Sequence, residues 1–143
     1  DVVPQELAAR FGFPLWVHDF VLEGGSIEVN GAGTVMTTEQ CLLNDNRNPH
    51  LSKRDIEARL HDALGTSHVI WLPGGIVGDD TDGHIDDIAR FVNETTVVAV
   101  APPQGHPDYD ILSRNLEALR RQRDQGGRAL DVIELPAPEP IQY

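Results

Sequence analysis

Two stretches of this chain follow the same order of elements, about sixty residues apart. In each stretch, two short strands joined by a turn are followed by a loop, a helix and a third strand. The third strands end alike, with Ile-Trp-Leu-Pro at residues 70–73 and Ile-Glu-Leu-Pro at residues 133–136. The sequence therefore predicts an α/β fold with strand-strand-helix-strand units over about residues 22–73 and 86–136. The alternative is two unrelated α/β stretches that happen to match.

Turn glycines, helix caps and apolar periodicity set the expected boundaries of these elements. Ser52 is placed to cap the first helix and Gly65 to end it. Asp108 or Asp110 is expected to cap the second helix, which should end before Gly126. The expected strands are residues 26–30, 34–38 and 68–72 in the first unit, and 85–92, 96–100 and 130–135 in the second; the first helix is 53–64.

The charge of the chain limits its partners. The formal net charge is −12, which argues against nucleic acid because few side chains could neutralise phosphates. It fits a cationic small molecule, although an acidic surface also keeps a protein soluble. Cys41 is the single cysteine, so no disulfide can form within the chain, which suits a reducing, cytoplasmic location. No apolar run is long enough to cross a membrane.

The ends of the chain suggest that it is a piece of a longer protein. It begins at Asp1 rather than methionine, and no signal peptide is visible. It ends in a proline-rich stretch, residues 136–140, that is typical of a linker. We therefore expect residues 1–143 to form the central part of a single domain.

An acidic run around one histidine is the strongest candidate site. Residues 78–87 read Gly-Asp-Asp-Thr-Asp-Gly-His-Ile-Asp-Asp, and carboxylates so close repel one another unless a cation lies between them. The calcium-loop pattern fails, since Gly78 and Ala89 stand where it needs acidic residues. A metal held by Asp82, His84 and Asp86 remains open, because these residues would share a face of a strand.

An organic cation would use the same residues differently. Asp86 could accept a bidentate hydrogen bond from a planar guanidinium, and His84 could transfer protons near neutral pH. Glu23 enters a strand behind apolar residues, so we expect it to be partly buried and to need a partner, for which His84 is a candidate. The alternative is a solvated acidic loop with a structural histidine. Cys41 has apolar neighbours and is interpreted as a structural residue rather than a nucleophile.

Long motifs give the chain a resemblance to a known family. The segments that carry it are Leu22–Ile27, Thr37–Asn44, Asn46–Ser52, Ile70–Pro73 and Gly78–Asp86. Together they resemble the agmatine deiminases, which belong to the guanidino-group-modifying enzymes. The resemblance implies the pentein fold, a ring-shaped α/β propeller of five strand-strand-helix-strand units, of which this chain would supply about two.

The resemblance also implies a reaction, the hydrolysis of agmatine to N-carbamoylputrescine and ammonia in putrescine and polyamine biosynthesis, without metal or organic cofactor. In this family a cysteine thiolate attacks the guanidinium carbon, and water later resolves the covalent intermediate. By the matching motif positions, His84 would be the catalytic histidine, Glu23 the carboxylate that orients it, and Asp86 a guanidinium ligand. Asp80 and Asp82 would line the substrate site.

The chain departs from the family pattern in two ways. The family nucleophile follows a glycine-rich segment that is not present here, and Cys41 matches a position that is not the nucleophile. A second guanidinium-binding aspartate belongs to a motif upstream of this chain. The chain alone is therefore expected to be inactive. A homo-oligomer of the full-length enzyme is a separate expectation.

Two alternatives stay open. One is a related deiminase of free or peptidyl arginine, which is disfavoured because Arg47 and Arg90 are the only arginines near the motifs that could bind a substrate carboxylate. The other is a non-catalytic cation-binding module that uses the acidic run.

Overall fold

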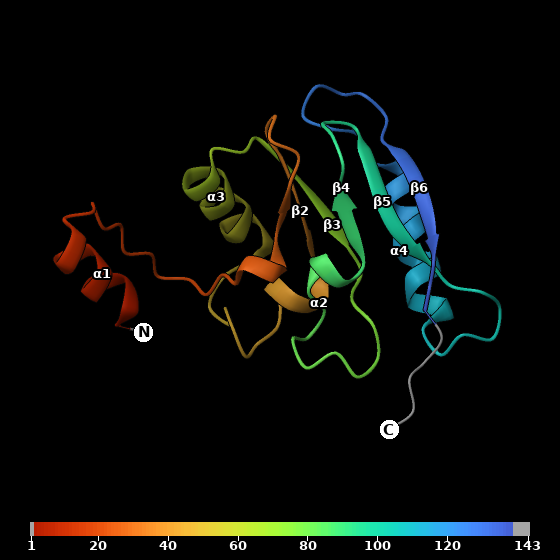
Figure 1. The fold of residues 1–143 in the computed structure, drawn as a ribbon, viewed down its shortest axis with the longest axis horizontal. Helices are drawn as coiled ribbons and strands as arrows, with labels where there is room; N and C mark the ends of the chain where they lie inside the picture. The colour runs from red at the N-terminus through yellow and green to blue at the C-terminus, as the bar shows by residue number, and fades with distance from the viewer. Residues whose placement is uncertain (1, 139–143) are drawn as a thin grey trace.

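A computed structural model describes residues 2–138 of the chain (Figure 1). The order of elements along the chain is α1 (Val3–Phe11), η1 (Gly24–Ser26), β1 (Glu28–Val29), β2 (Thr34–Thr38), α2 (Glu39–Leu42), α3 (Lys53–Leu64), β3 (His68–Leu72), η2 (Ile85–Asp87), β4 (Ala89–Phe91), β5 (Thr96–Ala101), α4 (Tyr109–Arg121) and β6 (Asp131–Pro136), where η marks a 3₁₀ turn.

The first sheet has the order β1-β2-β3. β1 and β2 are antiparallel, and β3 lies parallel to β2 with Thr34 opposite His68. Asn30 shapes the hairpin, because its side-chain oxygen accepts hydrogen bonds from the backbone N–H groups of Ala32 and Thr34, each at 2.9 Å. This side chain satisfies turn donors that would otherwise be left unpaired.

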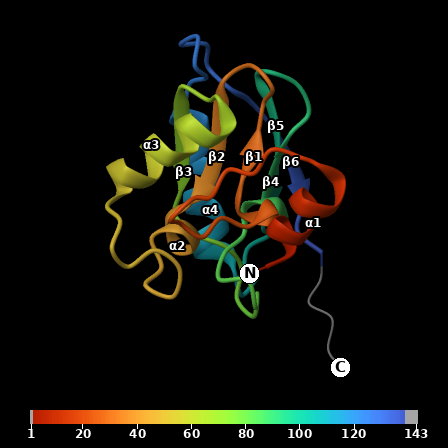
Figure 2. The ribbon, with the colours of Figure 1, turned by 90° about the vertical axis from the view of Figure 1, so that its left-hand side faces the viewer.

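Both faces of β2 are covered, so every residue of this strand is buried. On one face Val35 packs in a cluster with Ile56 and Leu60 of α3. On the other face Met36 joins the larger core that includes the second half of the chain. Figure 2 shows α3 lying over one side of β2 and β3. Three of its five residues are threonines, and their hydroxyls donate to the Gln125 side chain, the Ser26 carbonyl and the Gly83 carbonyl, so no buried hydroxyl of this strand is left unpaired.

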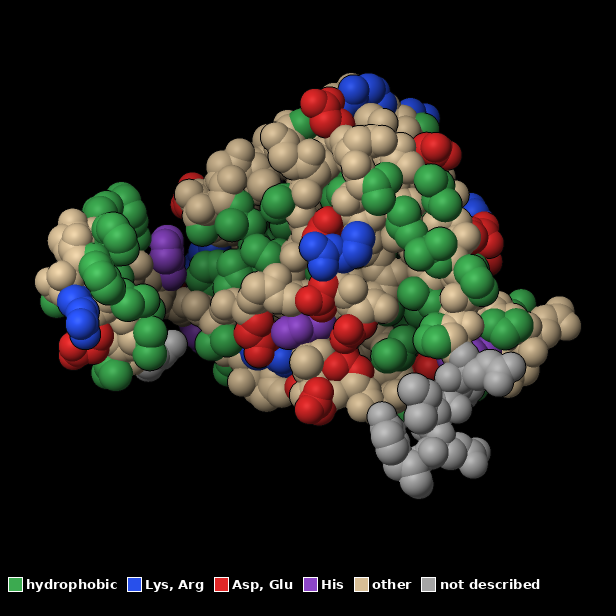
Figure 3. All heavy atoms as spheres, viewed as in Figure 1, with side chains coloured by type: hydrophobic (Ala, Val, Ile, Leu, Met, Phe, Trp, Pro, Cys, Tyr) green, Lys and Arg blue, Asp and Glu red, His purple; other side chains and the backbone are tan. Residues whose placement is uncertain are grey.

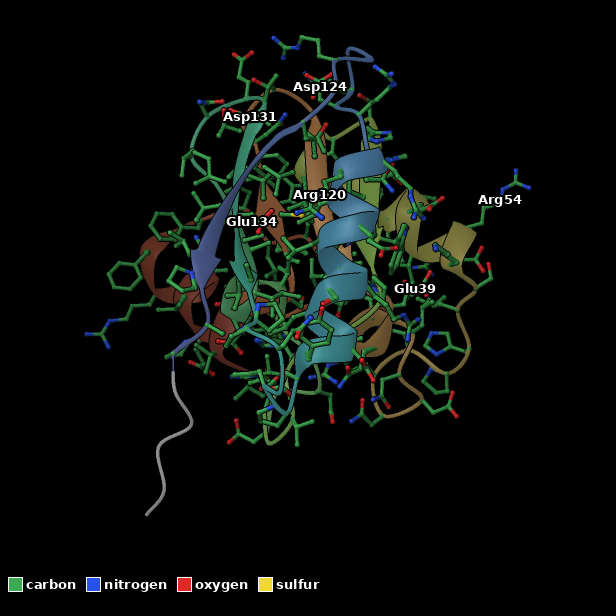
Figure 4. All side chains as sticks on the ribbon, turned by 90° about the vertical axis from the view of Figure 1, so that its right-hand side faces the viewer. Glu39, Arg54, Arg120, Asp124, Asp131 and Glu134 are labelled. Atoms are coloured by element: carbon green, nitrogen blue, oxygen red, sulfur yellow. The ribbon has the colours of Figure 1, made fainter. Side chains whose placement is uncertain are left out.

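The second sheet, β4-β5-β6, repeats the pairing of the first: an antiparallel pair followed by a parallel strand. The helix α4 packs against it with an apolar face made by Leu112, Leu116 and Leu119. Arg120 of α4 and Glu134 of β6 form an ion pair on the outside of the molecule (Figure 4). Both pairing partners of this bridge are half exposed, so its contribution to stability is small.

The two sheets meet along β1 and β4. Glu28 accepts a hydrogen bond from the backbone N–H of Phe91 at 2.9 Å, and the Asn30 amide donates to the carbonyl of Glu94 at 2.8 Å. Between the sheets lies one apolar core, drawn from both of them: Met36, Ile70 and Leu72 from the first half, and Ile85, Ile88, Ala89, Val97 and Ala99 from the second. This shared core fixes the second sheet against the first.

The first unit follows the sequence prediction closely. The strands 34–38 and 68–72 and the helix 53–64 are confirmed. Ser52 forms a capping box with Asp55, and Gly65 ends the helix in the left-handed conformation, with φ of 66°. β1 is shorter than expected because residues 24–26 form a 3₁₀ turn.

The prediction of an extended segment over residues 85–92 was wrong in its first half. Residues 85–87 form the turn η2, and only Ala89–Phe91 pair with β5. The turn is closed by a hydrogen bond from the Ile88 N–H to the Ile85 carbonyl at 3.1 Å. It buries Ile85 while leaving Asp86 and Asp87 exposed, which an alternating strand would not do for two adjacent carboxylates.

The expected N-cap of α4, Asp108, is confirmed in position only. The helix begins after Asp108, but the Asp108 side chain makes no capping hydrogen bond. Its Oδ1 accepts instead from the backbone N–H of Val77 at 2.7 Å. The carboxylate therefore ties α4 to the loop that follows β3.

The helices α1 and α2 were not expected. α1 has no buried residue and projects from the body (Figure 1). None of the helices between residues 2 and 138 is long and apolar enough to span a membrane. The proline-rich stretch expected to be a linker is described only as far as residue 138.

Replacing Asn115 with alanine should destabilise the fold. Its side chain is buried on α4 and donates to the Gly74 carbonyl at 2.7 Å, so alanine leaves that buried carbonyl unpaired. We expect a loss of about 1–3 kcal/mol in the free energy of unfolding, measured by urea denaturation. The exposed Arg121→Ala variant is the control and should change it by less than about 0.5 kcal/mol. Equal midpoints for the two variants would contradict the prediction.

Candidate active site

The candidate site is formed where two 3₁₀ turns from distant parts of the sequence meet. Glu23 precedes η1, and His84 and Asp86 lie at the start of η2. The turn at Glu23 is held by Ser26, whose hydroxyl donates to the Glu23 carbonyl at 2.6 Å. A Cβ at Gly25 would clash with His84 Nδ1 and lie 2.9 Å from Asp86 Oδ2, so only glycine permits this approach.

The predicted contact between Glu23 and His84 is confirmed. Glu23 Oε2 lies 3.1 Å from His84 Nε2. An ionised carboxylate can only accept, so Nε2 carries the proton in the neutral imidazole. The other ring nitrogen, Nδ1, then has a free lone pair and lies 3.9 Å from Asp86 Oδ1. The free nitrogen therefore lies on the Asp86 side of the ring.

Arg47 is a member of this cluster that the sequence analysis missed. Its Nε donates to Glu23 Oε2 at 2.7 Å, and its side chain is only 8% exposed. The Arg47 guanidinium holds the pKa of Glu23 below its usual value, opposed by partial burial and assisted by His84. The available signal was Glu23 itself, because a carboxylate that follows apolar residues needs a partner and Arg47 is one of few cations nearby, although the Glu23 side chain is 40% exposed in the structure.

Asp79 stabilises the acidic loop, residues 78–87, through hydrogen bonds within the loop. Its carboxylate accepts from the backbone N–H groups of Thr81 and Gly83, each at 2.7 Å. Burial alone would raise the pKa of Asp79, but these hydrogen bonds and that of the Thr81 hydroxyl hold it below its usual value. Burial and the nearby carboxylates Asp79 and Asp86 instead raise the pKa of Asp87.

The remaining predicted residues, Asp80 and Asp82, lie differently from Asp86. Asp82 has a left-handed backbone, φ 59°, and its carboxylate accepts from Asn46 at 2.7 Å and from Arg47 at 3.2 Å. Asp80 is exposed. The strand that would align Asp82, His84 and Asp86 as metal ligands does not form, since a bend and a 3₁₀ turn take its place.

A glutamine and three glycines bring the loop to the site. Gln40 Oε1 accepts from the Gly75 N–H at 3.1 Å, and the Gln40 side chain fills the space beside Gly74 and Gly83. A Cβ on Gly75 would collide with the backbone of Gly83. The loop after β3 and the acidic run therefore cross at Gly75 and Gly83, at a distance that only glycine allows. His84 comes directly after this crossing.

Cys41 lies closer to this cluster than the sequence indicated. It is fully buried on α2, and its Sγ is 3.9 Å from Glu23 Oε2. Burial raises the pKa of the Cys41 thiol to about 11, so the thiol is protonated at neutral pH. This agrees with a structural cysteine, although the assignment of its role remains a prediction.

Glu23, Cys41 and His84 each offer one ligand atom within 4.8 Å of the others, as a metal site would require. Two observations count against a cation there. Arg47 already neutralises the Glu23 oxygen, and Cys41 would have to lose a proton held with a pKa of about 11. Metal binding would therefore compete with a guanidinium and with a proton.

The surroundings of the site are open. Acidic and histidine side chains gather on one exposed face, over the region of η1 and η2 (Figure 3). Asp86 lines a shallow hollow of about 160 Å³ over β4 and β5. A larger cavity of about 460 Å³ is lined by Asp87 and mostly apolar residues, and its walls do not include Glu23, His84 or Asp86. Glu23 and Asp86 of the candidate site are therefore partly exposed and lie outside the larger cavity.

Comparison with known proteins places these residues in a family. The family model of Porphyromonas-type peptidyl-arginine deiminases matches residues 1–142. The chain belongs to this family. It is 48% identical to an agmatine deiminase of Pseudomonas aeruginosa (strain LESB58) over 124 residues, which are 86% of the chain and 34% of that protein. The chain therefore spans about a third of the length of the curated relatives that it matches.

Solved structures of this family have the same fold over nearly the whole chain. An agmatine deiminase of Enterococcus faecalis matches with a TM-score of 0.89 and 40% identity, covering 97% of this chain and 39% of that protein. An agmatine deiminase of C. jejuni, solved with substrate bound, matches with a TM-score of 0.86 and 39% identity, covering 99% and 42%. The α/β fold predicted from the sequence is confirmed by these matches.

The state of Cys41 can be tested by alkylation. With a buried thiol and a pKa of about 11, we expect iodoacetamide at pH 7.5 to label Cys41 far more slowly than it labels the same chain unfolded in urea. Labelling is measured by intact mass against time. Cys41 reacting in the native chain at the rate of the unfolded chain would contradict the assignment of an inert thiol.

Proposed function

We propose that this chain carries part of the active site of an agmatine deiminase, which hydrolyses agmatine to N-carbamoylputrescine and ammonia in polyamine biosynthesis. The observation that carries the proposal is the contact of Glu23 with His84 Nε2, which leaves His84 Nδ1 free beside Asp86 above Gly25. A carboxylate that binds a guanidinium and a nitrogen that can move protons thus lie together, as deimination requires.

In this proposal Asp86 accepts hydrogen bonds from the guanidinium and holds its carbon near His84. The thiol gives its proton to His84 Nδ1 and adds to that carbon as a thiolate. The C–N bond to one NH₂ group breaks, and the Nδ1 proton passes to that group, so ammonia leaves. Nδ1 then takes one proton from water, whose oxygen bonds to the same carbon; the C–S bond breaks to release the thiolate, and the remaining hydroxyl proton passes to solvent. Glu23 keeps the imidazole oriented throughout.

The proposed nucleophile is a cysteine on a segment that this chain does not contain. Cys41 is a poor candidate because its Sγ lies beside the Glu23 oxygen that binds Nε2, whereas the substrate-binding Asp86 lies beside Nδ1. Its raised pKa also disfavours the thiolate. Asp80 and Asp82 keep a proposed role in lining the site, with Asp82 acting through Arg47 and Asn46.

The proposed architecture of the longer enzyme is the five-unit pentein propeller. Residues 22–73 and 86–136 would be two of its units, which is supported by the repeated order and pairing of the two sheets. A homo-oligomer and a cytoplasmic location complete the proposal. No cofactor is part of it.

A deiminase of free or peptidyl arginine is the second candidate, favoured by the description of the family model. Such a substrate brings a carboxylate or amide that a cationic side chain would bind. The arginines near the site are already engaged: Arg47 with Glu23, and Arg90 with Glu28 at 2.8 Å. A substrate without a carboxylate, such as agmatine, therefore fits this part of the site better.

The proposal is tested with the full reading frame that contains this chain. We expect the enzyme to convert agmatine to ammonia and N-carbamoylputrescine and to turn over little arginine. In His84→Ala, kcat should fall by at least about 100-fold because proton transfer is lost. His61→Gln, on α3 and away from the site, is the matched control and should retain activity. Faster turnover of arginine would favour the second candidate, and a cation-binding module would bind agmatine in calorimetry without releasing ammonia.

The 143-residue chain alone should release no ammonia from agmatine. Covalent catalysis needs a thiolate in line with the guanidinium carbon, and Cys41 is buried and protonated at neutral pH. The measurement is a coupled ammonia assay on the isolated chain. Ammonia release that disappears in Cys41→Ser would show that Cys41 is the nucleophile after all.

A further inference from the structure

All three nitrogens of the Arg47 guanidinium are used within the site. Nε donates to Glu23 Oε2 at 2.7 Å, Nη2 donates to the Thr81 carbonyl at 2.7 Å, and Nη1 donates to Asn46 at 3.1 Å and Asp82 at 3.2 Å. The side chain is 8% exposed. An arginine buried to this extent with every nitrogen paired joins the η1 turn to the acidic loop, from a third segment of the chain.

We infer that Arg47 is a positioning residue for the proposed reaction: by holding Glu23 as a carboxylate against His84 Nε2, it fixes the tautomer that leaves Nδ1 free for the substrate. The inference rests on the proposed function for its catalytic meaning. Its structural content, the tautomer of His84 and the ionisation of Glu23, concerns this chain alone.

The geometry explains why one oxygen matters. Glu23 Oε2 lies 2.7 Å from Arg47 Nε and 3.1 Å from His84 Nε2, so a single oxygen accepts from both groups. If Glu23 lost its negative charge, no ionised acceptor would hold the imidazole proton on Nε2, and the tautomer with the proton on Nδ1 could form. Nδ1 could then no longer accept a proton from water. Arg47 opposes this change because its positive charge stabilises the carboxylate.

The sign of the pH effect follows. Arg47 is the largest cause of the lowered pKa of Glu23. Removing the guanidinium raises the pKa of Glu23, so the carboxylate and the productive tautomer are lost at higher pH than in the natural protein. The acid limb of the activity should shift toward neutral pH, while the alkaline limb has no such dependence on Glu23.

Lysine should replace arginine only in part. An ammonium can neutralise Glu23 but cannot present the planar set of donors that reaches Glu23, Asp82 and the Thr81 carbonyl together. Arg47→Lys thus separates the charge of the residue from its geometry. Arg90→Met is the matched control, since Arg90 also pairs with a glutamate, Glu28, but makes no contact with Glu23 or His84 in the part of the chain described.

The first experiment is NMR on the 143-residue chain. The side-chain carboxyl ¹³C shift of Glu23, assigned with Glu23→Gln, is followed against pH, and ¹⁵N-edited spectra report the tautomer of His84. We expect the Nε2–H tautomer in the natural chain and a rise of about 1 unit or more in the Glu23 pKa in Arg47→Met. Arg47→Lys should lie between them and Arg90→Met should match the natural chain. An unchanged Glu23 pKa and tautomer in folded Arg47→Met would overturn the inference.

The second experiment measures kcat/KM for agmatine against pH in the full reading frame. We expect the acid limb of the profile to shift to higher pH in Arg47→Met. The shift should be smaller in Arg47→Lys and absent in Arg90→Met. An unmoved acid limb would overturn the catalytic part. If Arg47→Met does not fold, the Arg47→Lys comparison decides the same points. No turnover of agmatine by the natural protein would refute the proposed function, while the NMR result would still decide what Arg47 does to Glu23 and His84.

Discussion

The site depends on one shared oxygen. Glu23 Oε2 accepts from Arg47 and lies within hydrogen-bond distance of His84, and Cys41 packs beside it. Carboxylates crowded into one loop repel one another unless a cation compensates them. Here a buried arginine from the same chain supplies part of that compensation through Asp82 and Glu23. Asp86 makes no ion pair with an arginine or lysine in the described chain, as its role in the proposed function, binding a cationic substrate, requires.

The fold serves this arrangement by holding two turns against each other. The two sheets share one apolar core and meet along β1 and β4, which fixes η1 relative to η2. Close packing makes such contacts rigid, so small errors in either sheet would separate Glu23 from His84. Gly25, Gly75 and Gly83 allow the backbone to come close enough, and Gln40 fills the remaining space.

Local signals predicted much of the first unit. The helix from Lys53 to Leu64 has its capping serine, its apolar face and its terminal glycine in the sequence. β2 is rich in β-branched residues and follows a glycine turn, and β3 is mostly apolar and is closed by Pro73. η2 could not be predicted in this way, because Ile85 to Phe91 reads as an extended segment. Residues 85–87 form a turn because Ile85 is buried in the shared core while Asp86 and Asp87 stay exposed.

By itself the sequence determined the α/β class and the caps of α3, which follow from periodicity and from capping residues. It also predicted the contact of Glu23 with His84, because a carboxylate expected to be partly buried needs a partner. Tertiary structure alone decided that Arg47 completes the pair, that Cys41 lies beside it, and that Asp82 faces Arg47 rather than a shared face with Asp86. Those contacts join residues that are far apart in the chain. Only the packing of the two sheets brings such residues together, and no local pattern in the sequence encodes it.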